Sequence, residues 1–203
     1  TPFPGPLEDC YAALRWIQAQ ADALGVDPAR IAIAGESAGG GLAAALAQLA
    51  HDRGEVTPRF QLLLYPMLDD RTTLQAEHAG RGEFVWTPAS NRLGWSAYLG
   101  RKPVLDDAPA YAAPARRQNL AGLPPAWIGV GDLDLFYPEN AAYAQRLREA
   151  GVPCEFYGVE GAYHAFATFQ PGAPVSQAFV ARSLAALREA FLHGFSGDSR
   201  TWK

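Results

Sequence analysis

A serine enclosed by glycines is the first feature of this sequence that could do chemistry. Residues 35–39 read Gly-Glu-Ser-Ala-Gly and join a short apolar run to an alanine-rich segment, so they link a predicted strand to a predicted helix. A serine on such a strained turn presents its hydroxyl as a nucleophile, and the crowding requires residues without a β-carbon two positions before and after it. The pattern predicts that Ser37 is a nucleophile. It also predicts that the N–H of Ala38, at the helix N-terminus, stabilises a developing oxyanion.

A serine hydroxyl needs a general base, and histidine is the usual one. The sequence has four histidines: His51, His78, His164 and His193. His164 lies in a loop directly after a predicted strand, whereas the other three lie near predicted helix ends or in a long connection. Catalytic side chains of α/β sheets are placed in loops at the carboxyl ends of strands. We therefore predict that His164 is the base and that the other three are solvated or capping side chains.

An acid must orient the imidazole of such a base and stabilise its charge. In the chain order Ser, acid, His it has to lie between Ser37 and His164. Asp132 and Asp134 both follow the predicted strand 126–130. Position alone does not distinguish them, and we expect the carboxylate that does not contact the histidine to fix loop backbone or cap the next helix.

Strands and helices alternate around these residues. Apolar runs predict buried strands at 30–34, 60–65, 126–130 and 154–159. Apolar spacing, prolines and glycines predict helices at 7–24, 38–50 and 138–151, and a last helix with Val180, Leu184, Leu187 and Phe191 on its buried face. This alternation indicates an α/β fold with a mostly parallel sheet and helices on both faces.

The connection from Met67 to Leu123 is too long for an ordinary loop, and we expect it to fold as helical insertions over the strand ends. It carries four aromatic candidates for substrate binding: Trp86, Trp95, Tyr98 and Tyr111. Two interpretations are equally open, because these rings either line an acyl or alcohol pocket or only pack the insertion. Glu36, beside the nucleophile, is a further substrate-binding candidate. The Asp-Asp-Arg run at 69–71 is predicted to form a structural network of ion pairs and turns.

Composition favours one globular domain over residues 1–203, which would carry the candidate catalytic residues. About half of the residues are apolar (49%), and the formal net charge of −4 comes with scattered rather than clustered basic residues. A nucleic-acid partner is therefore not expected. No apolar run reaches the roughly 18 residues that span a bilayer, no signal-peptide pattern opens the chain, and no cysteine spacing resembles a metal site. We expect a cytoplasmic protein without metal, cofactor or membrane partner, with Cys10 and Cys154 packed in its core.

Four segments together resemble the hormone-sensitive-lipase-like esterases. They are Gly-Glu-Ser-Ala-Gly-Gly at 35–40, Tyr-Pro-Met-Leu-Asp-Asp-Arg at 65–71, Leu-Ala-Gly-Leu-Pro-Pro at 120–125 and Gly-Ala-Tyr-His-Ala-Phe at 161–166. The resemblance implies an α/β-hydrolase fold and hydrolysis of carboxylic esters, of short to medium acyl chains, through an acyl-enzyme. In that family an apolar pair follows the acid, and an acidic residue opens a helix soon afterwards. Asp134, with Glu139 beyond it, matches this pattern better than Asp132.

One departure from the family is large. The family draws most of its oxyanion hole from a His-Gly-Gly-Gly loop upstream of the nucleophile, and this sequence has no such run, with only 36 residues before Ser37. We therefore expect this sequence to be the C-terminal portion of a longer esterase, or an upstream segment or second subunit to cover the edge of the strand from Ile31 to Ala34. The alternatives are a non-catalytic ligand-binding or scaffold protein, and a peptidase or amidase with the same three residues.

Overall fold

A four-stranded parallel sheet forms the centre of the molecule. In the computed structural model, which describes residues 1–197, the strands are β1 (Ala32–Glu36), β2 (Phe60–Leu64), β3 (Ala126–Gly131) and β4 (Cys154–Val159), side by side in that order. The register aligns Gly35 with Leu63, and Leu63 with Ile128. Because all four strands are parallel, the loops that carry the candidate residues leave from the same end of the sheet, where the strands have their carboxyl ends.

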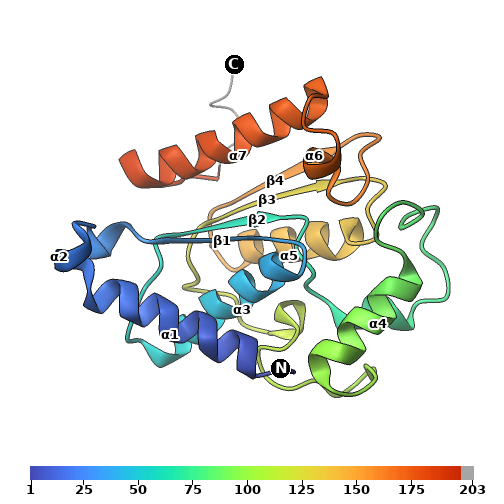
Figure 1. Cartoon of the computed structure of the whole chain (residues 1–203), viewed down its shortest axis with the longest axis horizontal. Coiled ribbons are helices and arrows are strands. Elements are labelled where there is room, and N and C mark those ends of the chain that lie inside the picture. The colour runs from blue at the N-terminus through green and yellow to red at the C-terminus, as the bar shows by residue number, and fades with distance from the viewer. Residues whose placement is uncertain (198–203) are drawn as a thin grey trace.

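Helices cover both faces of the sheet (Figure 1). On one face lie α1 (Gly5–Ala19), α3 (Ala38–Arg53) and α5 (Tyr137–Glu149), and on the other lie α6 (Phe166–Phe169) and α7 (Pro174–Leu192). Two short elements, α2 (Ala21–Leu24) and the 3₁₀ turn η1 (Pro28–Arg30), lead into β1. The α/β fold expected from the sequence is confirmed.

The connection from 67 to 123 folds around three short helical elements, as expected. They are η2 (Asp70–Leu74), α4 (Pro88–Leu99) and η3 (Pro114–Arg116). Thr87 caps α4, since its hydroxyl accepts from the N–H of Ser90, and Gly100 ends the helix with a φ of 69°. Figure 1 places α4 at the end of the sheet where the strands terminate.

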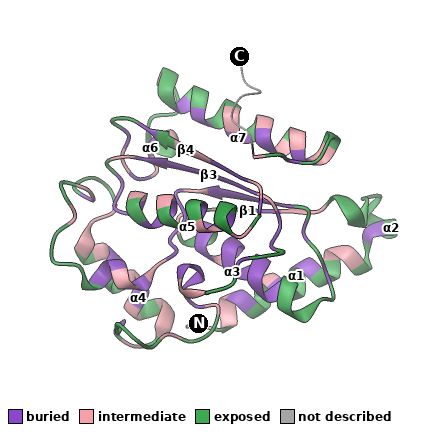
Figure 2. Ribbon diagram, turned by 180° about the vertical axis from the view of Figure 1, so that it is seen from behind, coloured by how far each residue is buried: buried purple, intermediate pink, exposed green. Residues whose placement is uncertain are grey.

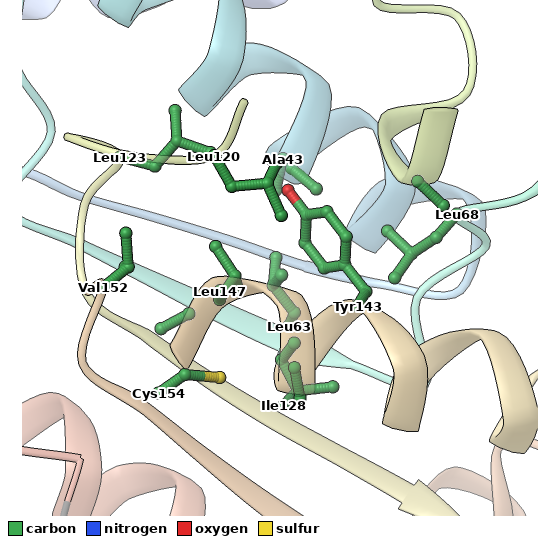
Figure 3. Close-up of a cluster of buried hydrophobic side chains, with 14 residues drawn as sticks. Ala43, Leu63, Leu68, Leu120, Leu123, Ile128, Tyr143, Leu147, Val152 and Cys154 are labelled. Carbon is green, nitrogen blue, oxygen red and sulfur yellow. The ribbon is translucent and has the colours of Figure 1, made fainter. Parts of the chain in front are cut away.

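The core has one apolar layer on each face of the sheet. Residues alternate along each strand, so Ile128 joins the cluster under α3 and α5 while its neighbour Trp127 joins the cluster under α7. Figure 3 shows the first cluster, in which Leu63, Tyr143 and Leu147 meet between β2 and α5. Figure 2 shows that burial is concentrated along β3 and the inner sides of the helices, and all six residues of β3 are buried. Such complete burial is typical of a central parallel strand.

Two predictions about helices were wrong. The helix predicted over 7–24 ends at Ala19, and Leu24 in the separate turn α2 is 46% exposed. The last helix does not bury Val180 and Leu184, which are 42% and 57% exposed. It buries Ser176, Phe179, Ser183, Ala186 and Ala190 instead. Small side chains let a helix lie close to a sheet. The buried face of α7 therefore consists of serines and alanines around the ring of Phe179, and the face that carries Val180 and Leu184 is left exposed.

Candidate active site

Ser37 occupies the sharp turn between β1 and α3. Its backbone has φ 55° and ψ −123°, a conformation that costs energy for a residue with a side chain and that persists only where neighbours hold it. Its N–H donates to the carbonyl of Leu64 at 2.9 Å, and its own carbonyl accepts from the N–H of Met67 at 2.9 Å. β2 and the loop after it therefore hold the turn on both sides of the hydroxyl.

The glycines around Ser37 have different reasons to be glycine. A β-carbon on Gly35 would overlap the backbone of Gly39, as the sequence pattern predicts. At Gly39 a β-carbon would meet no atom within 4 Å. The prediction that crowding excludes a β-carbon at this position was therefore wrong. Gly40 and Gly41 face the Pro66–Met67 backbone, and a β-carbon on Gly40 would lie 2.8 Å from the Pro66 side chain. The start of α3 is thus pressed against the loop that follows β2.

A continuous hydrogen-bonded chain joins the serine, the histidine and one aspartate. Ser37 Oγ lies 2.9 Å from His164 Nε2, and His164 Nδ1 lies 2.8 Å from Asp134 Oδ2. A carboxylate can only accept, so Nδ1 carries the ring proton and Nε2 is free to accept the serine hydroxyl. Asp134 and His164 are 1% and 4% exposed, whereas Ser37 is half-buried. Of these three side chains, Ser37 is therefore the most accessible from solvent.

The structure separates the two aspartates that the sequence left open. Asp134 contacts His164, and its other oxygen accepts from the N–H of Phe136 at 2.9 Å. Asp132 accepts from the N–H of Gly161 at 2.8 Å and so ties the loop after β3 to the loop after β4. Asp132 thus fixes loop backbone, the arrangement expected for the carboxylate that does not reach the imidazole.

Three aromatic rings surround the imidazole. The ring centroids of Tyr65 and Phe136 lie 5.1 and 5.3 Å from that of His164, both edge to face, and Trp86 lies 6.1 Å away. Tyr65 opens the segment at 65–71 that the sequence singles out, and Phe136 belongs to the apolar pair after Asp134, but sequence reasoning placed neither ring beside the imidazole. Rings packed in this way keep water from the imidazole and limit its rotation.

Glu36 is exposed, and its carboxylate accepts a hydrogen bond from the buried hydroxyl of Tyr65. Burial raises the pKa of Tyr65 far above its usual value, and the bond to Glu36 raises it further. Tyr65 therefore stays a neutral donor at all ordinary pH values. The contact turns Glu36 toward the ring that packs on His164, and its role in substrate binding remains a prediction.

An apolar cavity of about 170 Å³ opens beside the nucleophile. Its lining includes Ala38, Met67, Trp86, Trp95 and Tyr98, so three of the four aromatic candidates meet here. Burial raises the pKa of Tyr98 to about 12. A group bound in this cavity would lie beside Ala38, the residue that follows the nucleophile.

Comparison with known proteins agrees with this geometry. A family model described as the α/β hydrolase fold matches residues 1–168. Esterase LipI of Mycobacterium tuberculosis is 36% identical over 195 residues, which cover 95% of this chain and 60% of LipI. The chain belongs to the hormone-sensitive-lipase-like esterase family.

Two further named proteins show the same likeness. A bacterial heroin esterase is 41% identical with a TM-score of 0.88 over 94% of this chain and 61% of its own. The ethyl acetate hydrolase of Pseudomonas putida is 31% identical over 81% of this chain and 51% of its own length. The chain therefore spans about 60%, or less, of the length of these family members.

Tyr111 is the candidate that the structure does not bring to the site. Its hydroxyl donates to Asp52 Oδ2 at 2.8 Å, near the C-terminal end of α3. With a rise of about 1.5 Å per residue, Asp52 lies roughly 20 Å along the helix from Ser37. Of the two interpretations left open for Tyr111, pocket lining is wrong and packing of the insertion holds, because aromatic residues of one insertion can pack at opposite ends of the helix beneath it.

The side of the site next to β1 is open. Ala38 is the first residue of α3, so its N–H lies outside the helical ladder and is available to an oxyanion. In the part of the chain that the structure describes, β1 pairs with β2 alone. A groove of about 350 Å³ follows its outer edge, lined by Ile31–Ala34, by Leu42 and Leu46 of α3, and by residues of α1.

Metal-binding clusters, membrane-spanning helices and the two cysteines complete the description of residues 1–197. Among residues 1–197, no cluster of three or more histidine, cysteine or acidic side chains has the arrangement of a metal site. No helix in the same range is long and apolar enough to cross a bilayer. Cys154 is buried, as expected, with a pKa raised to about 12 by that burial, whereas Cys10 is only partly buried.

Proposed function

We propose that this chain carries the catalytic machinery of a carboxylesterase acting on esters of short to medium acyl chains. Ser37 is the nucleophile, His164 the general base and acid, and Asp134 the group that orients the imidazole. The observation that carries this proposal is the unbroken chain of hydrogen bonds from the Ser37 hydroxyl through His164 to the buried Asp134. The family relationship supports the same reaction.

The reaction follows from this geometry. Ser37 Oγ attacks the ester carbonyl carbon while His164 Nε2 takes the hydroxyl proton, and the N–H of Ala38 donates to the oxyanion that forms. The intermediate collapses to an acyl-serine, and the departing alcohol takes the proton from His164. Water then attacks the acyl-serine and gives a proton to Nε2. That proton returns to Ser37 as the carboxylic acid leaves.

The cavity lined by Ala38 and Trp86 supports a preference for small acyl groups. At about 170 Å³ it is smaller than the roughly 300–1,000 Å³ of pockets that hold drug-sized ligands. Its walls are apolar, so an alkyl chain gains from burial there while a charged group does not. The name of the Pseudomonas putida relative, an ethyl acetate hydrolase, points to a small ester for that protein.

A second part of the proposal concerns the open edge of β1. A strand absent from this sequence, from an upstream segment or a second subunit, pairs with that edge and brings a second oxyanion donor to the site. The apolar groove along Ile31–Ala34 and the greater length of the relatives support it. A non-catalytic scaffold role is not favoured, because the serine, histidine and aspartate keep a productive arrangement and the named relatives are esterases.

Replacing the nucleophile tests the function most directly. Ser37→Ala is expected to abolish both hydrolysis of p-nitrophenyl acetate and labelling by a fluorophosphonate. The matched control is Ser96→Ala, since the Ser96 hydroxyl donates to the carbonyl of Arg92 within α4. Labelling that survives in Ser37→Ala would remove Ser37 from its proposed role.

A further inference from the structure

The loop between β2 and η2 holds the nucleophile turn. The N–H of Met67 donates to the Ser37 carbonyl, and Gly41 lets that backbone approach closely, because a β-carbon there would overlap the carbonyl oxygen of Met67. Pro66 packs against Gly40 in the same way. Since Ser37 keeps a strained φ of 55°, any movement of this loop would let the turn relax.

Two neighbouring residues of α5 hold the loop in turn. Glu139 Oε1 accepts from the backbone N–H groups of Leu68 at 2.7 Å and Asp69 at 3.1 Å, and its other oxygen accepts from the Thr72 hydroxyl. Asn140 Nδ2 donates to the carbonyl of Pro66 at 2.7 Å. Glu139 is 7% exposed and Asn140 is fully buried, so water does not replace these bonds readily.

The hydrophobic core fixes the same loop from a second direction. The Leu68 side chain is fully buried and lies beside Tyr143, one turn along α5 from Glu139 (Figure 3). The start of α5 also follows directly on the turn of Asp134, whose second oxygen accepts from the N–H of Phe136. The N-terminal end of α5 therefore has two contacts with the site: the turn before it carries Asp134, and its first residues hold the loop that fixes Ser37.

We propose that Glu139 and Asn140 are positioning residues that hold Ser37 in its reactive conformation through the backbone of Pro66–Asp69. The inference rests on the proposed role of Ser37 as nucleophile. Neither side chain reaches the substrate, so their effect falls on the chemical step rather than on binding. Burial raises the pKa of Glu139 to about 8, although the hydrogen bonds that its carboxylate accepts act in the opposite direction. A neutral glutamine is therefore a fair replacement at this position.

The experiment compares three variants of the full 203-residue chain. Glu139→Met keeps the length of the side chain but removes both acceptor oxygens, whereas Glu139→Gln keeps an oxygen for the two N–H groups. Glu149→Met is the matched control, because Glu149 is an exposed residue near the end of the same helix and its carboxylate accepts from Gln145. The readouts are hydrogen exchange of the Met67 amide, followed by NMR, and the saturation kinetics of fluorophosphonate labelling at Ser37.

In Glu139→Met the Met67 amide is expected to exchange at least about tenfold faster, and the maximal labelling rate to fall about 10- to 100-fold with little change in half-saturation, since small misplacements cost that much. Glu139→Gln is expected to restore most of both values, and Glu149→Met to match the parent. If Glu139 only stabilised the fold, Glu139→Met would lower thermal stability without lowering the maximal labelling rate at an unchanged half-saturation concentration. If Glu139→Met does not fold, Asn140→Leu takes its place, because it keeps the branched shape of the side chain, adds no charge and removes the donor to Pro66.

The result that overturns the inference is a folded Glu139→Met or Asn140→Leu chain with parental exchange at Met67 or a parental maximal labelling rate. Failure of the proposed function looks different. In that case the parent chain itself is not labelled at Ser37, and the Met67 exchange still shows whether Glu139 holds the turn. Parental exchange then overturns the inference, and faster exchange supports it.

Discussion

The two halves of the candidate site differ in how completely their surroundings hold them. Asp134 and His164 follow β3 and β4, are almost fully buried, and are enclosed by aromatic rings and by the start of α5. Ser37 and Ala38 follow β1, where Ala34 and Glu36 are exposed and an apolar groove follows the outer edge. We call Asp134 and His164 the proton-transfer half of the site, and Ser37 and Ala38 the oxyanion half. The chain holds the proton-transfer half by its own packing, whereas in our proposal the oxyanion half depends on a further strand along β1.

The largest effect is expected in the proton-transfer half. Asp134→Asn places an amide against Nδ1 and favours the wrong imidazole tautomer, so kcat should fall about 10⁴-fold. Asp132→Asn is the matched control, since Asp132 accepts from Gly161 and does not touch the imidazole. Hydrolysis of p-nitrophenyl acetate by both folded variants measures the difference. Equal losses would mean that the two carboxylates do not have separate roles.

The oxyanion half should respond to a missing strand. A fusion that places before Thr1 a segment able to pair with β1 and to supply an oxyanion donor is expected to raise kcat roughly 10²- to 10³-fold, the usual effect of one such donor. The same fusion should slow amide hydrogen exchange along β1, while exchange along β3 stays as it was.

The control for this fusion carries Ser37→Ala and should be inactive, which excludes activity from the added part. A fully active 203-residue chain with a freely exchanging β1 edge would contradict the proposal, because the site would then need no further strand.

Narrowing the cavity beside Ala38 should have a smaller effect on the oxyanion half of the site. A β-carbon on Gly94 would lie 3.1 and 3.3 Å from the Trp86 ring, so Gly94→Val narrows the cavity. The preference for acetate over butyrate esters should rise about tenfold, at the lower end of the discrimination per methylene in apolar pockets. Ala97→Val, on the exposed side of α4, is the control. An unchanged ratio of kcat/KM would place the acyl group elsewhere.

The smallest effect concerns the far end of α3, the helix that begins after Ser37. Bidentate hydrogen bonds from Arg117, at 2.6 and 2.8 Å, lower the pKa of Asp52 to about 2. A lowered carboxyl pKa stabilises the fold above the unfolded value of about 4, and this contribution is lost as the pH falls from 4 toward 2. Because the pair is partly exposed to water, Asp52→Asn should lower the free energy of unfolding at pH 7 by only about 1 kcal/mol.

Urea unfolding between pH 7 and pH 3 measures this difference, which should narrow toward the acid end. Asp106→Asn, at an exposed position in the insertion, is the control. A difference that stays constant over this range would mean that the Arg117 contact does not act through the charge of Asp52.

Features that depend on short-range sterics and periodicity could be predicted from the order of the residues alone. The turn at 35–39 was recognisable because the Gly35 position tolerates no β-carbon, a constraint that acts within a few residues. The strands were recognisable because parallel strands buried on both faces are continuous apolar runs. The loop position of His164 followed from the strand before it.

Which side chains meet follows from the folded structure and not from any local pattern. Asp132 and Asp134 are two residues apart after one strand, and the packing of β3 against β4 decided that Asp134 reaches the imidazole. Packing also placed Tyr65 beside His164, moved Tyr111 to the far end of α3 and buried Phe179 rather than Leu184. These contacts join residues far apart in the chain, and their energies depend on the shape of the partner surface, which no local pattern encodes.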